Sequence, residues 1–284
     1  MTDASVRIVE MAARDGLQNE RDLVPTADKI ALIDMLSDTG LTRIEATSFV
    51  SPKWVPQLAD AAEVMAGISR KPGVVYSVLT PNLRGLERAL ESCADEVAVF
   101  ASASEGFSQR NINCSIAESI ERFRPVIDHA TSAGVRVRGY VSCVTDCPYD
   151  GPTPPEAVAR VTGELLALGC FEVSLGDTIG AGVPDTVGPM LDTVLTVADA
   201  VHLAGHFHDT NGRALDNIDV ALRAGIRIFD ASAGGLGGCP YAPGARGNVA
   251  TEAVVTHLTA QGFDTGIDVD RLTKAADFAR SLRN

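Results

Sequence analysis

One pattern recurs eight times along the chain: a short apolar, often β-branched run, then a loop, then a segment with helical spacing. The runs span residues 7–12, 43–48, 74–79, 96–102, 136–142, 171–177, 203–209 and 226–232. Strict alternation of strand and helix implies parallel strands, and eight such units close most simply into a (β/α)8 TIM barrel. A doubly wound open sheet is the alternative.

The eight units extend from about residue 6 to about residue 262, and no Pro-, Gly- or Ser-rich linker interrupts them. The tail that follows has a helical pattern over about residues 268–282. We therefore expect residues 1–284 to form a single barrel domain with an additional C-terminal helix. The length agrees with this, because such a barrel typically takes about 250 residues.

The charge and composition exclude several classes of function. The chain has 24 Lys and Arg against 37 Asp and Glu, a net charge of −13, so its long-range field repels nucleic acid and anionic membranes, and we expect neither as a partner. No apolar stretch approaches the ~20 residues of a membrane span, and the N-terminal residues have no secretory signal pattern. Six dispersed cysteines without a CxxC pair are typical of reduced thiols. We expect a cytoplasmic protein.

Polar residues gather where the predicted strands end, which is where such barrels carry their active residues. His206 and His208 lie two positions apart on one strand, so both side chains face the same side. They are either half of a metal site or a pair of hydrogen-bonded core histidines. Asp15 is the best carboxylate partner, and Asn248 is either an amide ligand or an ordinary turn residue. Such donors suit Mg2+, Mn2+, Co2+ or Zn2+.

Four further residues at these positions have side chains that can do chemistry. Arg14 is either a surface charge paired with its neighbour or a fixed guanidinium that stabilises an enolate or carboxylate oxygen. Glu45 and Asp177 stand where apolar side chains would otherwise fill the barrel, so they either orient the histidines or carry protons. Cys239 lies in a glycine-rich run, which indicates a mobile acid or nucleophile, although the glycines alone could form a turn or a phosphate nest.

Eight motifs, in order along nearly the whole chain, closely resemble those of the 3-hydroxy-3-methylglutaryl-CoA lyases of bacterial type. The glycine–cysteine motif is the most specific, because related barrel metalloenzymes that condense acetyl-CoA with 2-oxo acids, or act as aldolases, share only RDG and HxH. The motifs are RDGLQNE (14–20), TSFVSPKWVPQ (47–57), TPNL (80–83), NINCS (111–115), GYVSC (139–143), SLGDTIG (174–180), HFHDT (206–210) and GLGGCPYAPGARGN (235–248).

The resemblance implies cleavage of 3-hydroxy-3-methylglutaryl-CoA to acetoacetate and acetyl-CoA, as in leucine degradation. It implies that Arg14 contacts the acyl oxygen of the substrate and that Cys239 is the catalytic thiol. The hydroxyl proton leaves through His206, Asp177 or Glu45. A homodimer is expected from the resemblance alone. The residues implied to hold Mg2+ or Mn2+ are Asp15, His206, His208 and Asn248.

The phosphates of coenzyme A require a local group of basic residues in a chain with a net charge of −13. Besides Arg14 at the acyl end, we expect contacts from Lys53, after the second predicted strand, and from Arg110 and Asn111, after the fourth. Three other functions stay open. They are a lyase for a different 3-hydroxyacyl-CoA, a catalytically silent barrel that binds CoA or metal, and a phosphate-binding barrel isomerase.

Overall fold

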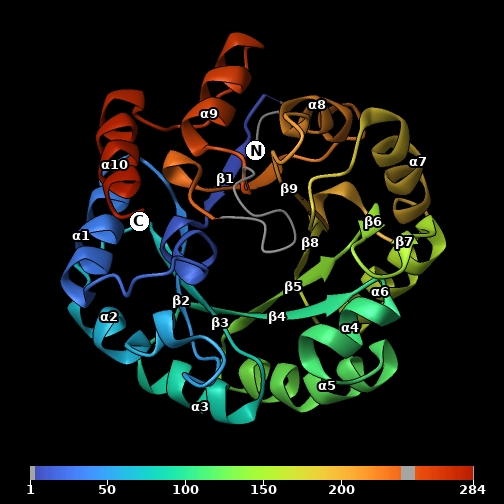
Figure 1. The fold of residues 1–284 in the computed structure, drawn as a ribbon, viewed down its shortest axis with the longest axis horizontal. Helices are drawn as coiled ribbons and strands as arrows, with labels where there is room; N and C mark the ends of the chain where they lie inside the picture. Colours follow the sequence, from blue (N-terminus) through green and yellow to red (C-terminus); the bar gives the residue numbers. More distant parts are fainter. Residues whose placement is uncertain (1–3, 238–246, 284) are drawn as a thin grey trace.

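Eight parallel strands close a barrel in the computed structural model, which describes residues 4–237 and 247–283. Around the barrel they follow the order β1-β10-β9-β8-β5-β4-β3-β2. Figure 1 shows the helices arranged as a ring outside them. The barrel strands are β1 (Arg7–Glu10), β2 (Arg43–Ser48), β3 (Val75–Leu79), β4 (Glu96–Ser102), β5 (Arg136–Ser142), β8 (Glu172–Asp177), β9 (Leu203–Phe207) and β10 (Ile228–Ala231). The predicted (β/α)8 barrel is confirmed, and the open sheet is wrong.

Each barrel strand is followed by at least one helix, and the expected C-terminal helix is present as α10. In α1, Ile33 and Leu36, which are three positions apart and therefore share one face of the helix, are fully buried. The helices are α1 (Thr26–Ser37), α2 (Ala61–Gly67), α3 (Leu83–Glu91), α4 (Glu105–Ile112), α5 (Ile116–Ser132), α6 (Pro155–Ala167), α7 (Pro184–Val194), α8 (Ala214–Arg223), α9 (Thr251–Ala260) and α10 (Val269–Ser281).

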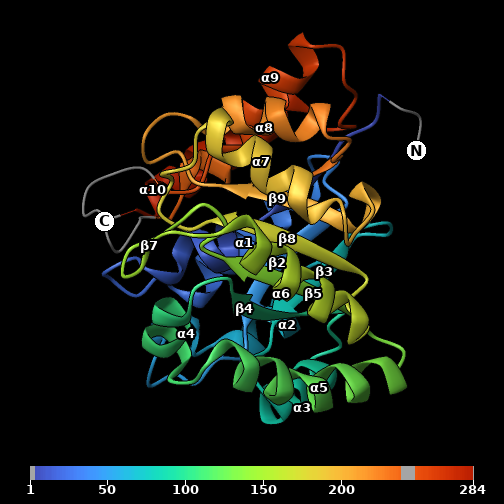
Figure 2. The same ribbon diagram turned by 90° about the vertical axis from the view of Figure 1, so that its right-hand side faces the viewer.

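The sequence did not predict three local features. Helix α4 precedes the larger α5, and a small hairpin, β6 (Asp146–Cys147) with β7 (Gly151–Pro152), follows β5. In Figure 2 this hairpin and α4 lie on the same side of the molecule. The first strand also ends two residues earlier than expected, because the chain turns at Ala12 into the π-helix η1 (Ala12–Gly16). Arg14 and Asp15 belong to that π-helix.

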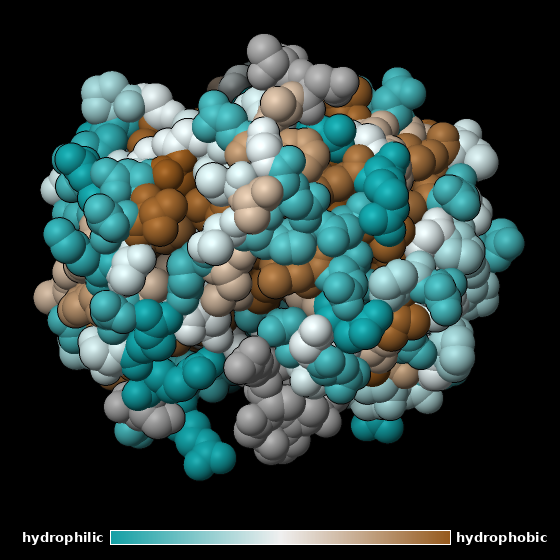
Figure 3. Space-filling model, turned by 90° about the horizontal axis from the view of Figure 1, so that it is seen from above, coloured by the Kyte–Doolittle hydropathy of each residue, from teal (hydrophilic) through white to brown (hydrophobic). Residues whose placement is uncertain are grey.

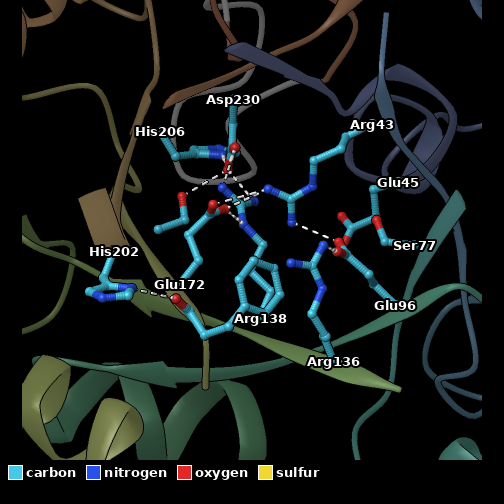
Figure 4. A network of polar contacts seen from close by, with 12 residues as sticks. Arg43, Glu45, Ser77, Glu96, Arg136, Arg138, Glu172, His202, His206 and Asp230 are labelled. Carbon is cyan, nitrogen blue, oxygen red and sulfur yellow. Dashed lines mark hydrogen bonds and ion pairs between the residues drawn. The ribbon is translucent and has the colours of Figure 1, made fainter. Parts of the chain in front are cut away.

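Buried charges cross one layer of the barrel interior. Arg43 donates to Glu96 at 2.7 Å and to Glu172 at 2.9 Å, and Arg138 donates to Glu172 at 2.6 Å and to Asp230 at 2.8 Å. These five residues come from β2, β4, β8, β5 and β10, and all are buried. Figure 4 shows the arginines between the carboxylates. The row therefore ties five strands together through their side chains.

The described residues include no helix that is long and apolar enough to cross a membrane. On the face drawn in Figure 3, hydrophilic and hydrophobic residues are interspersed. Seven large apolar side chains in the described part of the chain are nevertheless exposed. They are Leu23, Trp54, Leu83, Tyr149, Val197, Val201 and Val269, of which Trp54 is the most exposed at 84%.

Glu10, at the end of β1, joins three segments by hydrogen bonds. Its carboxylate accepts from the backbone N–H of Ala12 at 2.8 Å and of Ala233 at 2.9 Å, and from the Thr251 hydroxyl at 2.7 Å. Burial raises the pKa of Glu10 to about 7, although these hydrogen bonds lower it in part. The pKa of Glu10 is therefore higher in the folded protein than in the unfolded chain. Protonated Glu10 stabilises the fold at low pH, and this stabilisation is lost as pH rises toward 7.

We predict that Glu10→Gln gains stability relative to the wild type as pH rises, because an amide keeps an acceptor oxygen and never ionises. The difference in the free energy of unfolding between variant and wild type should shift by about 1–3 kcal/mol in favour of the variant between about pH 5 and pH 8. Urea unfolding measures it, with exposed Glu63→Gln as the control. A difference that does not change with pH would contradict the assigned pKa.

Candidate metal and catalytic site

Three predicted ligands lie together at one end of the barrel. Asp15, His206 and His208 each offer one ligand atom, and these atoms lie within 4.8 Å of one another. The two histidine rings have centroids 5.2 Å apart, as expected for residues two positions apart at a strand end. His206 belongs to β9, His208 follows it, and Asp15 reaches them from η1. The cluster contains the carboxylate partner that the metal-site prediction requires, and the metal ion itself stays a prediction.

Asn248 lies beside this cluster. Its amide nitrogen donates to Asp15 at 2.8 Å and to the carbonyl of Leu236 at 3.2 Å. A backbone bridge also pairs Asn248 with His208. Because the amide hydrogens are engaged, the oxygen is the atom of Asn248 with which it would bind a cation.

Two glycines allow these segments to approach one another. Gly237 has φ +104°, and a Cβ there would lie 2.5 Å from the Asn248 amide nitrogen. A Cβ on Gly16 would lie 2.8 Å from the Cβ of Leu236. Any side chain at Gly237 would therefore displace Asn248 from Asp15 as well as strain the backbone.

The protonation states of two ligands suit a cation. Burial opposes the charge on Asp15, but Arg14 and the two histidines lower its pKa to about 2. Burial and neighbouring His206 lower the pKa of His208 to about 4. At neutral pH, Asp15 is therefore an anion and His208 a neutral imidazole, which are the forms that bind metal. Carboxylate, imidazole and amide donors together fit a divalent cation.

Asp230, on β10, fixes the orientation of His206. Its carboxylate lies 3.2 Å from Nδ1 of His206 and accepts from the hydroxyl of Ser174 at 2.8 Å and from Arg138. Figure 4 shows His206 at the end of the row of buried charges. The other ring nitrogen, Nε2, is thereby left for a metal. Sequence reasoning missed Asp230, although an aspartate within an otherwise apolar strand run was a usable signal.

Arg14 is held rigidly beside Asp15. Its guanidinium donates to Asp15 at 2.6 Å and, in a short contact, to Glu45, and it lies 5.7 Å from the centroid of the Tyr140 ring. The Tyr140 hydroxyl donates to Glu45 at 3.1 Å. Although burial disfavours the charge, Glu45 and Asp15 raise the pKa of Arg14 overall. The surface alternative is wrong, because the Arg14 side chain is buried.

Glu45 and Asp177 occupy different surroundings. Both oxygens of Glu45 accept from Arg14 and Tyr140, so this carboxylate orients Arg14. Asp177 accepts from Thr145 at 3.1 Å and from the backbone N–H of residues 181 and 182, so it anchors the loop after β8. Burial raises the pKa of Glu45 and brings that of Asp177 to about 6. In the hydrogen bonds of the described residues, neither carboxylate orients a histidine as one of our alternatives expected.

The predicted CoA contacts lie on the surface, apart from the buried Arg14. Lys53 is exposed in the loop after β2. Arg110 and Asn111 are exposed on α4, where the Arg110 guanidinium lies 5.4 Å from the centroid of the Tyr149 ring. Cys239, the predicted catalytic thiol, lies outside the described residues. These assignments stay predictions.

Comparison with known proteins decides the family. The HMGL-like family model matches residues 5–279. The chain belongs to the HMGL-like family. A crystal structure of the HMG-CoA lyase from Brucella melitensis is 68% identical, with a TM-score of 0.98 over 98% of this chain and 99% of that one.

Two further relatives of this HMGL-like chain carry substrate information. The 3-hydroxy-3-isohexenylglutaryl-CoA/hydroxymethylglutaryl-CoA lyase of Pseudomonas aeruginosa is 57% identical over 270 residues, which are 95% of this chain and 90% of that protein. An HMG-CoA lyase from Acinetobacter baumannii, solved with coenzyme A and 3-methylmalate, is 38% identical, with a TM-score of 0.94 over 99% of this chain and 92% of that one.

We predict that Gly237→Ala in this HMGL-like protein weakens Mn2+ binding by about tenfold or more, because its Cβ displaces Asn248 from the ligand cluster. Calorimetric titration with Mn2+ measures this. Gly212→Ala is the matched control, since Gly212 also has a positive φ but has no atom within 4 Å of its added Cβ. Both variants should lose about 1 kcal/mol of stability through backbone strain. Equal Mn2+ affinity in the two variants would contradict the crowding argument.

Proposed function

We propose that this protein is a divalent-metal-dependent carbon–carbon lyase that cleaves 3-hydroxy-3-methylglutaryl-CoA to acetoacetate and acetyl-CoA, a reaction of leucine degradation. One observation carries the proposal: the ligand atoms of Asp15, His206 and His208 lie within 4.8 Å of one another in a chain of this family. The buried Arg14 lies against the same cluster. The silent-barrel alternative is disfavoured, because each described ligand expected for the reaction is present.

The cation would be held by the ligand cluster together with the oxygen of Asn248. When bound, a divalent cation lowers the pKa of a coordinated hydroxyl, as it does for coordinated water. We propose Mg2+ or Mn2+, because the donor set contains carboxylate and amide oxygens and, among the described residues, no thiolate.

Arg14 is assigned to the developing enolate. When the bond beside the tertiary hydroxyl breaks, its electron pair passes to the thioester fragment and negative charge appears on the thioester oxygen. A guanidinium fixed in advance stabilises such charge without reorganising during the reaction. Glu45 and Asp15 hold Arg14 in place, and Tyr140 holds Glu45.

Two proton transfers complete the reaction. The hydroxyl proton passes to a base, for which His206, Asp177 and Glu45 are the candidates; the raised pKa values of the two carboxylates bring them closer to the range a general base needs. We assign protonation of the enolate carbon, which yields acetyl-CoA, to the thiol of Cys239. The chain's own groups thus supply one acid and one base.

Three finer parts complete the proposal. The CoA portion of the substrate contacts Lys53, Arg110 and Asn111, which are exposed on loops and α4 near one end of the barrel. A relative solved with coenzyme A supports CoA as the carrier. We also propose a homodimer located in the cytoplasm.

The decisive assay measures acetoacetate release from 3-hydroxy-3-methylglutaryl-CoA with and without EDTA, followed by addition of Mn2+. We expect EDTA to abolish turnover and Mn2+ to restore it. Cys239→Ala should lower kcat by about a hundredfold or more, because it removes the acid. Acetoacetate release that survives removal of metal would contradict the metal-dependent mechanism, and full activity of the variant would remove the thiol from it.

A second substrate deserves a direct test, because one relative is named for both an isohexenylglutaryl and a methylglutaryl thioester. Acyl-tail specificity depends on pocket volume, which motifs do not determine. We expect kcat/KM to be highest for 3-hydroxy-3-methylglutaryl-CoA in a panel of 3-hydroxyacyl-CoA esters. A higher value for the longer branched ester would assign the chain to that substrate.

A further inference from the structure

Three polar side chains on helices outside the barrel meet at one point. His257 lies in the last turn of α9, and its Nε2 is 2.7 Å from Oδ1 of Asp219, on α8. The side-chain nitrogen of Gln261, which directly follows α9, is 2.8 Å from the same Asp219 oxygen and 2.7 Å from Nε2 of His257. We call these three residues the α8–α9 cluster. The proposed lyase chemistry does not use them.

Hydrogen bonds alone do not satisfy the α8–α9 cluster. Its three atoms contact one another in pairs, so each pair would need one donor and one acceptor, and an ionised carboxylate oxygen only accepts. If Nε2 of His257 carries a hydrogen, it and the Gln261 nitrogen are two donors 2.7 Å apart. If Nε2 carries none, it and the Asp219 oxygen are two acceptors 2.7 Å apart. Each assignment therefore leaves a repulsive contact.

Rotation of the Gln261 amide does not remove the conflict. The rotation exchanges the amide nitrogen and oxygen, and the oxygen then faces the Asp219 oxygen, which is also an acceptor. A cation changes this balance, because it attracts the lone pairs of all three atoms at once. With the amide rotated, the cluster offers one imidazole nitrogen and two oxygens, which are donors that bind divalent metals.

The spacing of the three atoms is close to that of neighbouring ligands on one metal ion. With metal–ligand bonds of about 2.1 Å, adjacent ligands of an octahedral ion lie about 3 Å apart. The three separations in the α8–α9 cluster are 2.7, 2.8 and 2.7 Å. Small side-chain movements would therefore place the three atoms in adjacent ligand positions.

The surroundings of the α8–α9 cluster admit a cation. The side chains of His257 and Asp219 are 26% and 31% exposed, so an ion can reach them from solvent. The opposing charge is the exposed Arg223, four residues beyond Asp219 on α8, and in the described part of the chain it forms no ion pair with Asp219. The net charge of −13 also favours cations over anions near the surface.

We propose that the α8–α9 cluster is a second cation site, which binds Zn2+ or a similar first-row divalent ion. Its ligands are Nε2 of His257, the carboxylate of Asp219 and the amide oxygen of Gln261, and water fills the remaining positions. Helices α8 and α9 are neighbours in the ring around the barrel, as Figure 1 and Figure 2 both show, so the ion would join them. The inference does not depend on the proposed function.

Calorimetric titration of the metal-free protein with Zn2+ tests the site. We expect His257→Ala to bind one equivalent of Zn2+ fewer than the wild type, and His208→Ala, which alters the other cluster, to keep that equivalent. Gln261→Glu should bind it more tightly, because a carboxylate replaces the amide, and Gln261→Ala more weakly. His202→Ala is the matched control: His202 is also exposed, but its Nδ1 lies 2.9 Å from the carbonyl of Phe171, and its loss should change nothing.

Thermal unfolding provides a second measurement. An ion that binds only the folded protein stabilises it, so Zn2+ should raise the Tm of His208→Ala. The rise should disappear when His257→Ala is added. Acetoacetate release by His257→Ala with Mn2+ should equal that of the wild type, because the α8–α9 cluster shares no ligand with Asp15 and His206.

Two results would overturn the proposal. They are the same number of bound Zn2+ ions in His257→Ala and in the wild type, and a rise in Tm that survives both substitutions. Neither result depends on acetoacetate release, so this proposal and the proposed function fail separately.

Discussion

The site depends on a row of buried charges that crosses the barrel. Glu96, Arg43, Glu172, Arg138 and Asp230 alternate in sign, and each contacts the next within 3 Å. Taking such groups out of water is costly, and removing one partner from a buried pair typically costs about 3–5 kcal/mol because it leaves an uncompensated charge. The strands that carry these residues are thereby fixed relative to one another.

Arg138 connects this row to both halves of the site. Through Asp230 it sets the orientation of His206, a predicted metal ligand. It also donates to the Tyr140 hydroxyl at 2.9 Å, and Tyr140 in turn donates to Glu45, which holds Arg14. Burial raises the pKa of Tyr140, which keeps this hydroxyl protonated and able to donate. One buried guanidinium therefore positions both the metal ligand and the cation assigned to the enolate.

The sequence predicted the strands and the clustered ligands of this arrangement well, but it did not predict the residues that hold those ligands in place. Strand runs 43–48, 96–102 and 136–142 have the bounds that the structure shows, because a short, often β-branched apolar run is a local property of the sequence. Asp15, His206 and His208 were predicted to meet, because the carboxyl ends of parallel strands share one end of a barrel. Arg138 and Asp230 were not predicted, because their ion pair crosses the barrel interior between β5 and β10, which are not neighbouring strands and lie far apart in the sequence. The π-helix that carries Asp15 begins at Ala12, whose N–H donates to the side chain of Glu10. The spacing of apolar residues does not predict such a helix either.

The most direct test of this account is the Mn2+ affinity of Asp230→Asn, measured by titration calorimetry on folded protein. Asparagine keeps the size of the side chain but removes the charge shared by His206 and Arg138. The account predicts that Mn2+ binds about 10–100-fold more weakly, as happens when the partner of a ligating histidine is lost. Wild-type affinity in a correctly folded variant would contradict the claim that the buried row positions the metal site.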